Sequence, residues 1–537
     1  MSTDRPLTVA SGRTLPAILR DGAARQADRP LLIFENASGA VTSYTWRQIE
    51  ERSHAVAARL RRLGVKPGDR LHLHLPNRPE FLLLWFAAAH LRASMVPTNT
   101  AATADELAYI LGHAEPSASV TDSSGRAVVT RAREQVGSDG PLLDCDVEDL
   151  LNLDPEPAME TASDPNSEPH GADELAVMYT SGTTSNPKGV QITHANYIYT
   201  GEVVASALRL GPDDRFLTVL PLFHANAQYY STMGTLIGGG TLVLAARFSA
   251  SRLLEQAVRH EATLASLFAA PMRMVLAQQA SPRWREHRLR VVVFAQNLTQ
   301  AEYQRWDELI GAPLLQLYGM TETIGPPVMN PLLGPRRHDT LGRPVLGYEC
   351  QVVREDGTST DVEEPGELLI GGVPGVSLMN GYLHDPEATA AALQDGWLRT
   401  GDVVSVARDG FLSFVDRRKD MIKRAGENIA ASEVEAVLLD HPHVSEAAVV
   451  GVPDRMRDEQ IIAFVVLDEP HAASEAEMIE WCVQRLSKFR IPSSIKFREE
   501  LPRTAVGKIQ KHHLRADYIS RQPEQPARAI HREDSTR

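Results

Sequence analysis

A repeated alternation of short apolar segments with helical patterns, between residues 216 and 317, most constrains how this chain folds. Five segments have the length and composition of buried strands, at 216–220, 241–244, 264–267, 290–294 and 314–317. Helical patterns separate them, among them 229–237 and 250–260. This alternation predicts a largely parallel sheet with helices on its faces. In such sheets ligands bind beyond the carboxyl ends of the strands.

The pattern differs on either side of this region. Before it, residues 70–75 alternate strictly and predict a strand, 80–91 predict a helix, and 154–174 read as an acidic surface linker. After about residue 342, three segments resemble antiparallel strands joined by Asp/Gly turns, at 348–353, 366–370 and 410–415. A smaller α+β pattern follows, with helices at 432–439 and 475–486 and strands at 447–452 and 460–467.

These patterns predict an α/β protein with several parts. A large N-terminal domain over 1–415 contains the βα-alternating sheets and a small β-barrel-like subdomain. A small α+β C-terminal domain covers 416–521. The polar, proline-containing segment 522–537 is predicted to be a disordered tail.

Composition excludes several classes of function. The formal net charge of −14 disfavours binding to nucleic acid or to an anionic membrane, which requires a basic face. Three widely spaced cysteines fit a reducing compartment and show no metal-ligand spacing. The most apolar run, 81–89, is too short to span a bilayer, and the N-terminal residues lack a signal-peptide pattern. We therefore expect a cytoplasmic enzyme with no nucleic-acid or membrane partner; a homodimer stays open.

The segment YTSGTTSNPKGV at 179–190 is the first candidate for ligand binding. Its hydroxyl groups can donate hydrogen bonds, its glycines allow close approach of the backbone, and its lysine adds a positive charge. Successive backbone N–H groups in such a turn form an anion-binding nest. The segment differs from a Walker A motif, because Pro187 precedes Lys188 and Gly189 follows it. It predicts a polyphosphate-binding loop.

Four further segments follow in a fixed order: YGMTET at 318–323, TGD at 400–402, DRRKDMIKRAGEN at 416–428 and PRTAVGK at 502–508. With the loop at 179–190, they resemble the adenylate-forming superfamily of acyl-CoA synthetases, peptide-synthetase adenylation domains and luciferases. The resemblance covers residues 15–518. Segments 295–299, 371–375 and 421–428 are most similar to bacterial crotonobetaine/carnitine-type CoA ligases.

The resemblance implies a role for each motif. ATP, Mg²⁺ and CoA are the expected cofactors, and Glu322 is the expected Mg²⁺ ligand. Lys508, Thr184, His224 and Glu322 are the expected catalytic residues, with Lys508 bridging the acyl carboxylate and the α-phosphate. The residues expected to bind ATP or CoA are Thr180, Ser181, Gly182, Thr183, Thr184, Lys188, Ala295, Gln296, Asn297, Tyr318, Gly319, Thr321, Asp402, Arg417, Lys423 and Gly426.

Within that set, the Thr180–Lys188 loop would hold the β- and γ-phosphates and Thr321 the α-phosphate. Asp402 and Arg417 would bind the ribose, and residues 295–297 with Tyr318 would line the adenine. The resemblance also implies that the C-terminal domain is mobile, swinging about Asp416 to open a pantetheine tunnel beside Gly426. The family often has a second glycine where this chain has Ala425.

His224 matches a position beside the acyl pocket of the family, where it would gate the carboxylate; a backbone-bonded loop histidine is the alternative. Further pocket candidates are Asn226, Gln228, Tyr229 and Met320. The implied function is ATP-dependent adenylation of a small carboxylic acid followed by transfer to CoA, with release of AMP and pyrophosphate. The alternatives are transfer to a carrier protein or amine, and adenylation of nitrite to diazotise an aromatic amine. The resemblance favours a short or polar acid, with an aromatic acid as a further option, over a long-chain fatty acid.

Overall fold

The structure is a computed structural model that describes residues 12–153, 168–180, 187–418, 420–424, 427–454, 458–469, 473–503 and 509–521. The chain forms two compact units, of which the first ends at Phe414 and the second begins at Val415. Each unit has a hydrophobic core of its own. The predicted tail over 522–537 and most of the predicted linker lie outside the described residues.

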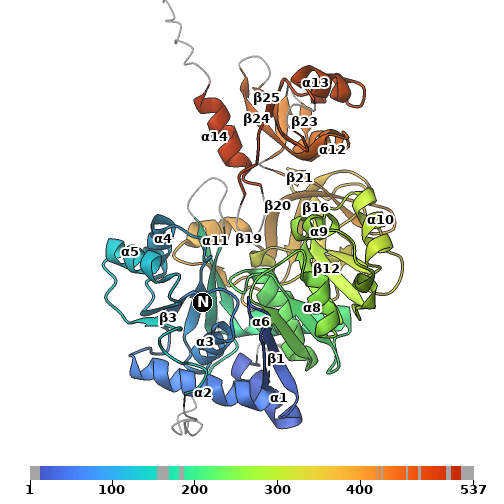
Figure 1. Cartoon of the computed structure of the whole chain (residues 1–537). Helices are drawn as coiled ribbons and strands as arrows, with labels where there is room; N and C mark the ends of the chain where they lie inside the picture. The colour runs from blue at the N-terminus through green and yellow to red at the C-terminus, as the bar shows by residue number, and fades with distance from the viewer. Residues whose placement is uncertain are drawn as a thin grey trace, which may run out of the picture. The chain divides into compact units, whose positions relative to one another are not determined.

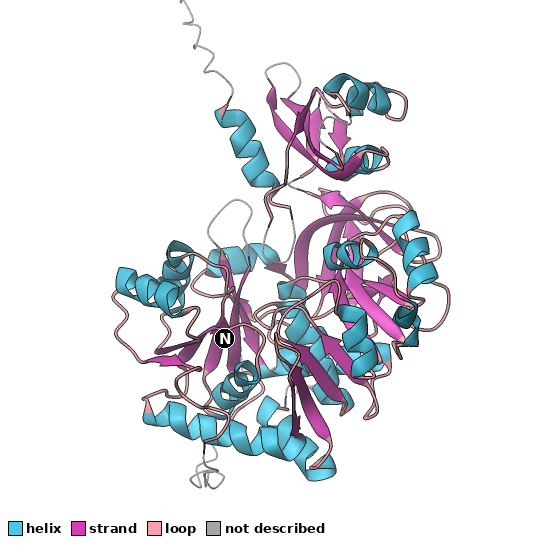
Figure 2. Cartoon of the chain, viewed as in Figure 1, coloured by secondary structure: helices cyan, strands magenta, loops and turns pink. Residues whose placement is uncertain are grey.

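A nine-stranded sheet in the first unit contains the five predicted strands (Figures 1 and 2). These are β9 (Arg215–Thr218), β10 (Thr241–Ala245), β11 (Leu264–Phe268), β12 (Val291–Ala295) and β13 (Leu314–Tyr318). They pair in the order β13-β12-β11-β9-β10, and every pair is parallel. The prediction of a parallel sheet is therefore confirmed. The edges of the sheet are β1 (Pro30–Glu35), β2 (Val41–Thr45), β14 (Val328–Met329) and β15 (Arg343–Pro344).

The helices α8 (Leu253–Arg259), α9 (Ala269–Leu276) and α10 (Gln300–Leu309) connect these strands and bury apolar side chains against the sheet. The helix α10 starts at a capping box, in which Thr299 and Glu302 each bind the other's backbone N–H. The helix predicted at 229–237 is different. It is a π-helix, η2 (Asn226–Met233), followed by the short α7 (Gly234–Gly238). π-Helices are frequent at functional sites, and apolar periodicity does not distinguish them from α-helices.

A seven-stranded sheet in the first unit carries the phosphate-loop candidate. Its strands are β18 (Gly381–Tyr382), β8 (Lys188–Thr193), β7 (Glu174–Thr180), β4 (Ser94–Pro97), β3 (Arg70–His74), β5 (Ala118–Thr121) and β6 (Leu142–Asp144). The prediction that Glu174 ends a surface linker is wrong. It begins β7, where it pairs with Thr193 of β8, and its carboxylate accepts hydrogen bonds from Arg70 on β3 and Ser94 on β4.

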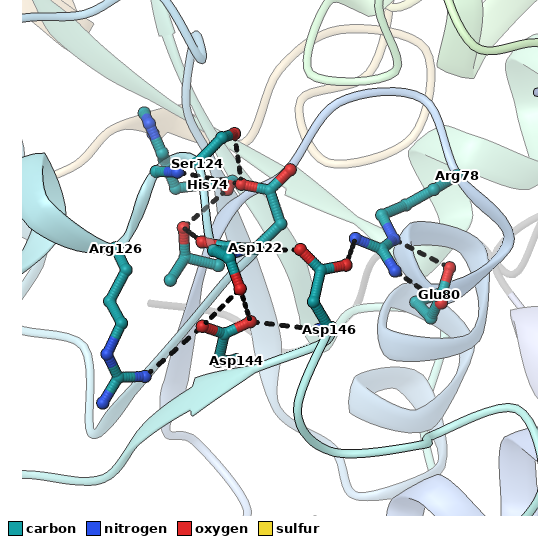
Figure 3. A network of polar contacts seen from close by, with 11 residues as sticks. His74, Arg78, Glu80, Asp122, Ser124, Arg126, Asp144 and Asp146 are labelled. Carbon is teal, nitrogen blue, oxygen red and sulfur yellow. Dashed lines mark hydrogen bonds and ion pairs between the residues drawn. The ribbon is translucent and has the colours of Figure 1, made fainter. Parts of the chain in front are cut away.

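Polar side chains at the carboxyl ends of β3, β5 and β6 tie three loops together (Figure 3). Arg78 lies between Glu80, at 2.8 Å, and Asp146, at 2.9 Å. Asp146 also accepts a hydrogen bond from the backbone N–H of Ser123, and this bond holds the pKa of Asp146 below its usual value. Arg126 reaches only the edge of the network, 3.6 Å from Asp144. These contacts fix the strand ends of this sheet.

A five-stranded antiparallel sheet completes the first unit, as the change of pattern after residue 342 predicts. Four of its strands lie in this unit: β16 (Glu349–Val353), β17 (Gly366–Gly371), β19 (Leu393–Gln394) and β20 (Trp397–Val406). The fifth, β21 (Leu412–Arg417), begins in the first unit and ends in the second. The remaining helices of the unit are α1 (Leu15–Gln26), α2 (Trp46–Arg62), α3 (Pro79–His90), α4 (Ala104–Ala114), α5 (Arg126–Val136), α6 (His194–Leu208) and α11 (Pro386–Ala392).

The second unit is a small α+β structure. Its strands are β22 (Ile422–Arg424), β23 (Glu427–Ile429), β24 (Val444–Asp454), β25 (Asp458–Leu467) and β26 (Ser494–Phe497), and its helices are α12 (Ala431–Leu439), α13 (Glu475–Val483) and α14 (Lys511–Ser520). Alternate residues of β24 and β25 face two apolar clusters, one under α12 and α13 and the other under α14. In neither unit does a described helix have the length and apolar character needed to cross a bilayer.

Candidate active site

Tyr318 and Asp402 meet where the nine-stranded sheet approaches the antiparallel sheet. Tyr318 is the last residue of β13, and its hydroxyl donates a 2.7 Å hydrogen bond to Oδ2 of Asp402 on β20. Asp402 is only 5% exposed. Two residues that are predicted to bind different parts of the nucleotide are therefore in direct contact, at the carboxyl end of a parallel strand where ligands bind.

Glu322 lies in the short 3₁₀ helix η4 (Thr321–Thr323), which begins shortly after the end of β13. Its carboxylate is buried, and Oε1 accepts a 3.1 Å hydrogen bond from the hydroxyl of Tyr382. Burial and the neighbouring Glu322 carboxylate raise the pKa of Tyr382 far above its usual value, so that the phenol stays a donor. The main-chain oxygen of Thr321 accepts a hydrogen bond from Tyr229.

The phosphate-loop candidate connects two antiparallel strands. Thr180 ends β7, Lys188 begins β8, and the two residues are paired across the hairpin. The Lys188 ammonium lies 4.8 Å from the ring centroid of Tyr382. The loop residues between the two strands that are predicted to bind phosphate lie outside the described residues, namely Ser181, Gly182, Thr183 and Thr184.

The predicted adenine-binding turn follows β12. Ala295 ends the strand. The backbone of Gln296 has a positive φ of 76°, which is uncommon for a residue other than glycine. Asn297 accepts a 2.8 Å hydrogen bond from Gln316 on the neighbouring strand β13. Gly319, the residue after β13, is tightly packed, because a Cβ at this position would lie 2.6 Å from both the Gly325 oxygen and the Tyr230 hydroxyl. The turn and the end of β13 are therefore held against each other.

His224 lies beside this region, in the turn before the π-helix. Its ring packs edge-on against Phe268 at 5.6 Å, and Nδ1 accepts a hydrogen bond from the backbone N–H of Asn226. Burial lowers the pKa of His224 to about 4, so the ring is neutral at pH 7. The Asn226 oxygen accepts a 2.7 Å hydrogen bond from Ser266, whereas its buried amide nitrogen has no partner within the described part of the chain.

Two other pocket candidates, Gln228 and Met320, make hydrogen bonds within the fold. Gln228 is fully buried and bonds Tyr197 and the Leu222 oxygen, which supports the π-helix from within. Met320 lies between β13 and η4, and its backbone N–H is bonded to Thr323. Sequence reasoning missed Tyr382, which contacts both Glu322 and Lys188. No local periodicity marks it, because its position depends on the pairing of β18 with β8.

The remaining predicted residues belong to the second unit. Arg417 ends β21, and Lys423 is an exposed residue of β22. Gly426 and Lys508 lie outside the described residues. Asp416 is 3% exposed, and its two oxygens accept hydrogen bonds from the backbone N–H groups of Arg417 and Ser432. Burial raises the pKa of this carboxyl.

The donors in the first unit fit magnesium bound together with a polyphosphate. Among the described residues, no group of three or more His, Cys, Asp or Glu side chains could hold a metal ion. Mg²⁺ does not require such a group, since it commonly binds one or two carboxylates together with substrate phosphates. Glu322 offers a buried hard oxygen ligand, and Lys188 offers a cation for phosphate oxygens.

This fold and these residues define an enzyme of the adenylate-forming class. The model of the AMP-binding enzyme family matches residues 19–383, and that of the AMP-binding enzyme C-terminal domain matches residues 433–508. The chain belongs to the AMP-binding enzyme family, as its five motifs predict.

Known relatives cover nearly the whole chain. A crotonobetaine/carnitine–CoA ligase of Salmonella heidelberg is 36% identical over 521 residues, which cover 95% of this chain and 100% of that protein. ATP-bound MatB from Rhodopseudomonas palustris is similar with a TM-score of 0.83 and 27% identity, covering 94% of this chain and 99% of that one. O-succinylbenzoate coenzyme A synthetase (MenE) from Bacillus subtilis, in complex with ATP and magnesium ion, has a TM-score of 0.81 and 30% identity, covering 93% and 98%.

Proposed function

We propose that this chain is an AMP-forming acid–CoA ligase that acts on a small polar carboxylic acid. In the first step a carboxylate oxygen attacks the α-phosphorus of ATP and pyrophosphate leaves. In the second step the CoA thiol attacks the acyl carbon, and AMP leaves with the electron pair of the broken C–O bond. The observation that carries this proposal is the convergence of Tyr318, Asp402, Glu322 and Lys188 around the carboxyl end of β13 and the hairpin of β7 and β8.

The first step joins two anions, so its catalysis depends on positioning and charge neutralisation. Glu322 would hold Mg²⁺, which neutralises phosphate oxygens when it is bound. Lys188 places a second positive charge at the phosphate loop. Asp402, held by Tyr318, would accept hydrogen bonds from the ribose hydroxyls. Lys508 is assigned to the adenylyl group that is transferred, because of the motif in which it lies.

The second step is assigned to a movement of the second unit about Asp416. A hinge requires a few residues that absorb the change in backbone conformation. The backbone around Asp416 is held by the two hydrogen bonds that its carboxylate accepts. In the same unit, Lys511 and Glu435 form a largely buried ion pair, with 2.7 Å between Nζ and Oε1. These contacts support a defined pivot at the start of the unit.

A polar acid is favoured by the side chains beside His224. The Asn226 amide nitrogen is buried and lacks a partner within the described residues, although Ser266 binds the oxygen of the same side chain. An unpaired buried donor is costly unless a ligand or water accepts its hydrogen bond. An acid that carries an acceptor beyond its carboxylate would satisfy this donor.

Pyrophosphate release tests the proposal directly. The purified protein is incubated with MgATP and a panel of short, hydroxylated, aromatic and quaternary-ammonium acids, each with and without CoA, and with nitrite plus aryl amines. We expect release that depends on a carboxylic acid, and acyl-CoA formation when CoA is added. Release that requires nitrite and responds to no carboxylate would overturn the proposal. Asn226→Leu should lower kcat/KM for polar acids more than for apolar acids of similar size.

A further inference from the structure

Tyr382 occupies a fixed position between two parts of the candidate site. Its strand β18 pairs with β8, where Tyr382 faces Val190, two residues after Lys188. The next residue, Leu383, donates its backbone N–H to the Gly189 oxygen at 2.8 Å. The Tyr382 N–H is bonded to Thr389 of α11 at 2.9 Å. The backbone of Tyr382 is therefore held on both sides, which limits the directions that its side chain can take.

The Tyr382 side chain makes one contact with Glu322 and one with Lys188. The hydroxyl donates to Glu322 Oε1 at 3.1 Å, and the ring lies 4.8 Å from the Lys188 ammonium. The segment that leads into β18 is also joined to η4 through the main chain, because Met379 donates its backbone N–H to the main-chain oxygen of Glu322 at 3.0 Å. Glu322 is 5% exposed, so its carboxylate has little freedom to adopt another position around this hydrogen bond.

The two contacts have different chemistry. A hydrogen bond to a carboxylate oxygen fixes the rotation of the carboxylate plane and leaves the group charged. A cation near an aromatic ring is attracted by the negative face of the ring, and this attraction does not consume the hydrogen bonds that an ammonium can donate to phosphate. Tyrosine is the residue that supplies both an aromatic face and a hydroxyl donor in this geometry.

We propose that Tyr382 is a positioning residue for the adenylation step, which orients the Glu322 carboxylate for Mg²⁺ through its hydroxyl and the Lys188 ammonium for the polyphosphate through its ring. The inference rests on the proposed function, since it takes Glu322 as the metal ligand and Lys188 as a phosphate ligand. It adds Tyr382 as a residue that connects Glu322 with Lys188, so that the ligands of the metal and of the polyphosphate are held in one set of contacts.

Two substitutions separate the contacts. Tyr382→Phe removes the hydroxyl and keeps the ring, whereas Tyr382→Leu removes both. Tyr303→Phe is the matched control, because Tyr303 is a buried tyrosine of the first unit that packs against Phe294 on β12. ATP binding is measured by calorimetry without any acid, in the presence of Mg²⁺ and in the presence of a chelator. Acid-dependent pyrophosphate release is measured across a range of Mg²⁺ concentrations.

We expect Tyr382→Phe to raise the Mg²⁺ concentration for half-maximal pyrophosphate release by roughly tenfold, as the loss of a residue that orients a metal ligand does. Its affinity for ATP without metal should match the wild type. Tyr382→Leu should weaken metal-free ATP binding as well, because Lys188 loses its aromatic contact. The control should behave as the wild type in every measurement.

An unchanged Mg²⁺ dependence in Tyr382→Phe would overturn the inference. Equal loss of ATP affinity with and without metal in that variant would also overturn it, since it would indicate a general structural role. Tyr382→Phe decides the question even if Tyr382→Leu does not fold, because it changes one hydroxyl group. A wild-type protein that binds no MgATP would instead contradict the proposed function, and the two failures are therefore distinguishable.

Discussion

The hydroxyl of Tyr318 donates a 2.7 Å hydrogen bond to Oδ2 of Asp402, although 84 positions separate the two residues in the chain. The bond joins the last residue of β13, in the parallel sheet, to β20 in the antiparallel sheet. Asp402 is buried, and the hydrogen bond from Tyr318 orients its carboxylate. This contact makes the proposed ribose ligand part of a rigid framework.

Replacing Asp402 by asparagine should weaken ATP binding by roughly 10- to 100-fold, since a hydrogen bond to a charged group contributes about 1.5–3 kcal/mol. Tyr318→Phe should have a smaller effect in the same direction, because it leaves the carboxylate in place but less firmly oriented. Calorimetric titration with ATP measures both. Asp409→Asn is the control, as Asp409 is an exposed partner of Arg337. Wild-type affinity in Asp402→Asn would contradict the ribose assignment.

Lys508→Ala should reduce adenylate formation by at least about 100-fold, because it removes the charge that stabilises the transferred group. Thiolysis of a supplied acyl-adenylate should stay within about twofold of the wild-type rate, since that step does not require the same stabilisation. Pyrophosphate release and CoA-thioester formation measure the two steps separately. Lys488→Ala, at an exposed lysine of the same unit, provides the control. Equal losses in both steps would argue against this role for Lys508.

Arg78→Met should lower the free energy of unfolding by about 3 kcal/mol, because it leaves the buried Glu80 carboxylate without its partner. Arg126→Met should change it by less than about 0.5 kcal/mol, since Arg126 is half exposed and 3.6 Å from Asp144. Both residues belong to the network in Figure 3. Denaturant titrations of the two variants test the contrast, and similar losses in both would contradict it.

Acidification should destabilise the fold through four histidines, of which His72 and His194 are fully buried and His90 and His224 are half-buried. Burial lowers the pKa of His72 and His90 to about 3, and of His194 and His224 to about 4, from an ordinary value of 6.5. Above pH 6.5 neither the folded nor the unfolded chain protonates them, and their contribution to stability is fully present. As the pH falls below 6.5 the unfolded chain takes up protons that the folded chain excludes, so the free energy of unfolding decreases down to about pH 3.

The free energy of unfolding, measured by denaturant titration from pH 7.5 to pH 4.5, tests this expectation. His90→Gln should reduce the slope below pH 6 by about 1.4 kcal/mol per pH unit, the contribution of one proton. His443→Gln should leave the slope unchanged, because His443 is exposed. An equal slope in wild type and His90→Gln would contradict the assignment of this pH dependence to these histidines.

Local sequence patterns were sufficient to predict those elements whose structure depends on residues close together in the chain. The strands β9 to β13 follow from short apolar runs, because burial on both faces requires nearly continuous apolar side chains. The capping box of Thr299 and Glu302 lies within four residues and sets the start of α10 in the same way. The π-helix at Asn226 did not follow, because its wider turn depends on buried contacts such as that of Gln228 with Tyr197.

The sequence by itself determined the class of fold and the family, since periodicity and motif order are properties of the chain alone. Only the tertiary structure decided that Tyr382 lies between Glu322 and Lys188, and that Glu174 begins a strand. Such contacts join residues on strands and turns that are remote in the chain. They are set by strand register and by the burial of charge, which no local pattern contains.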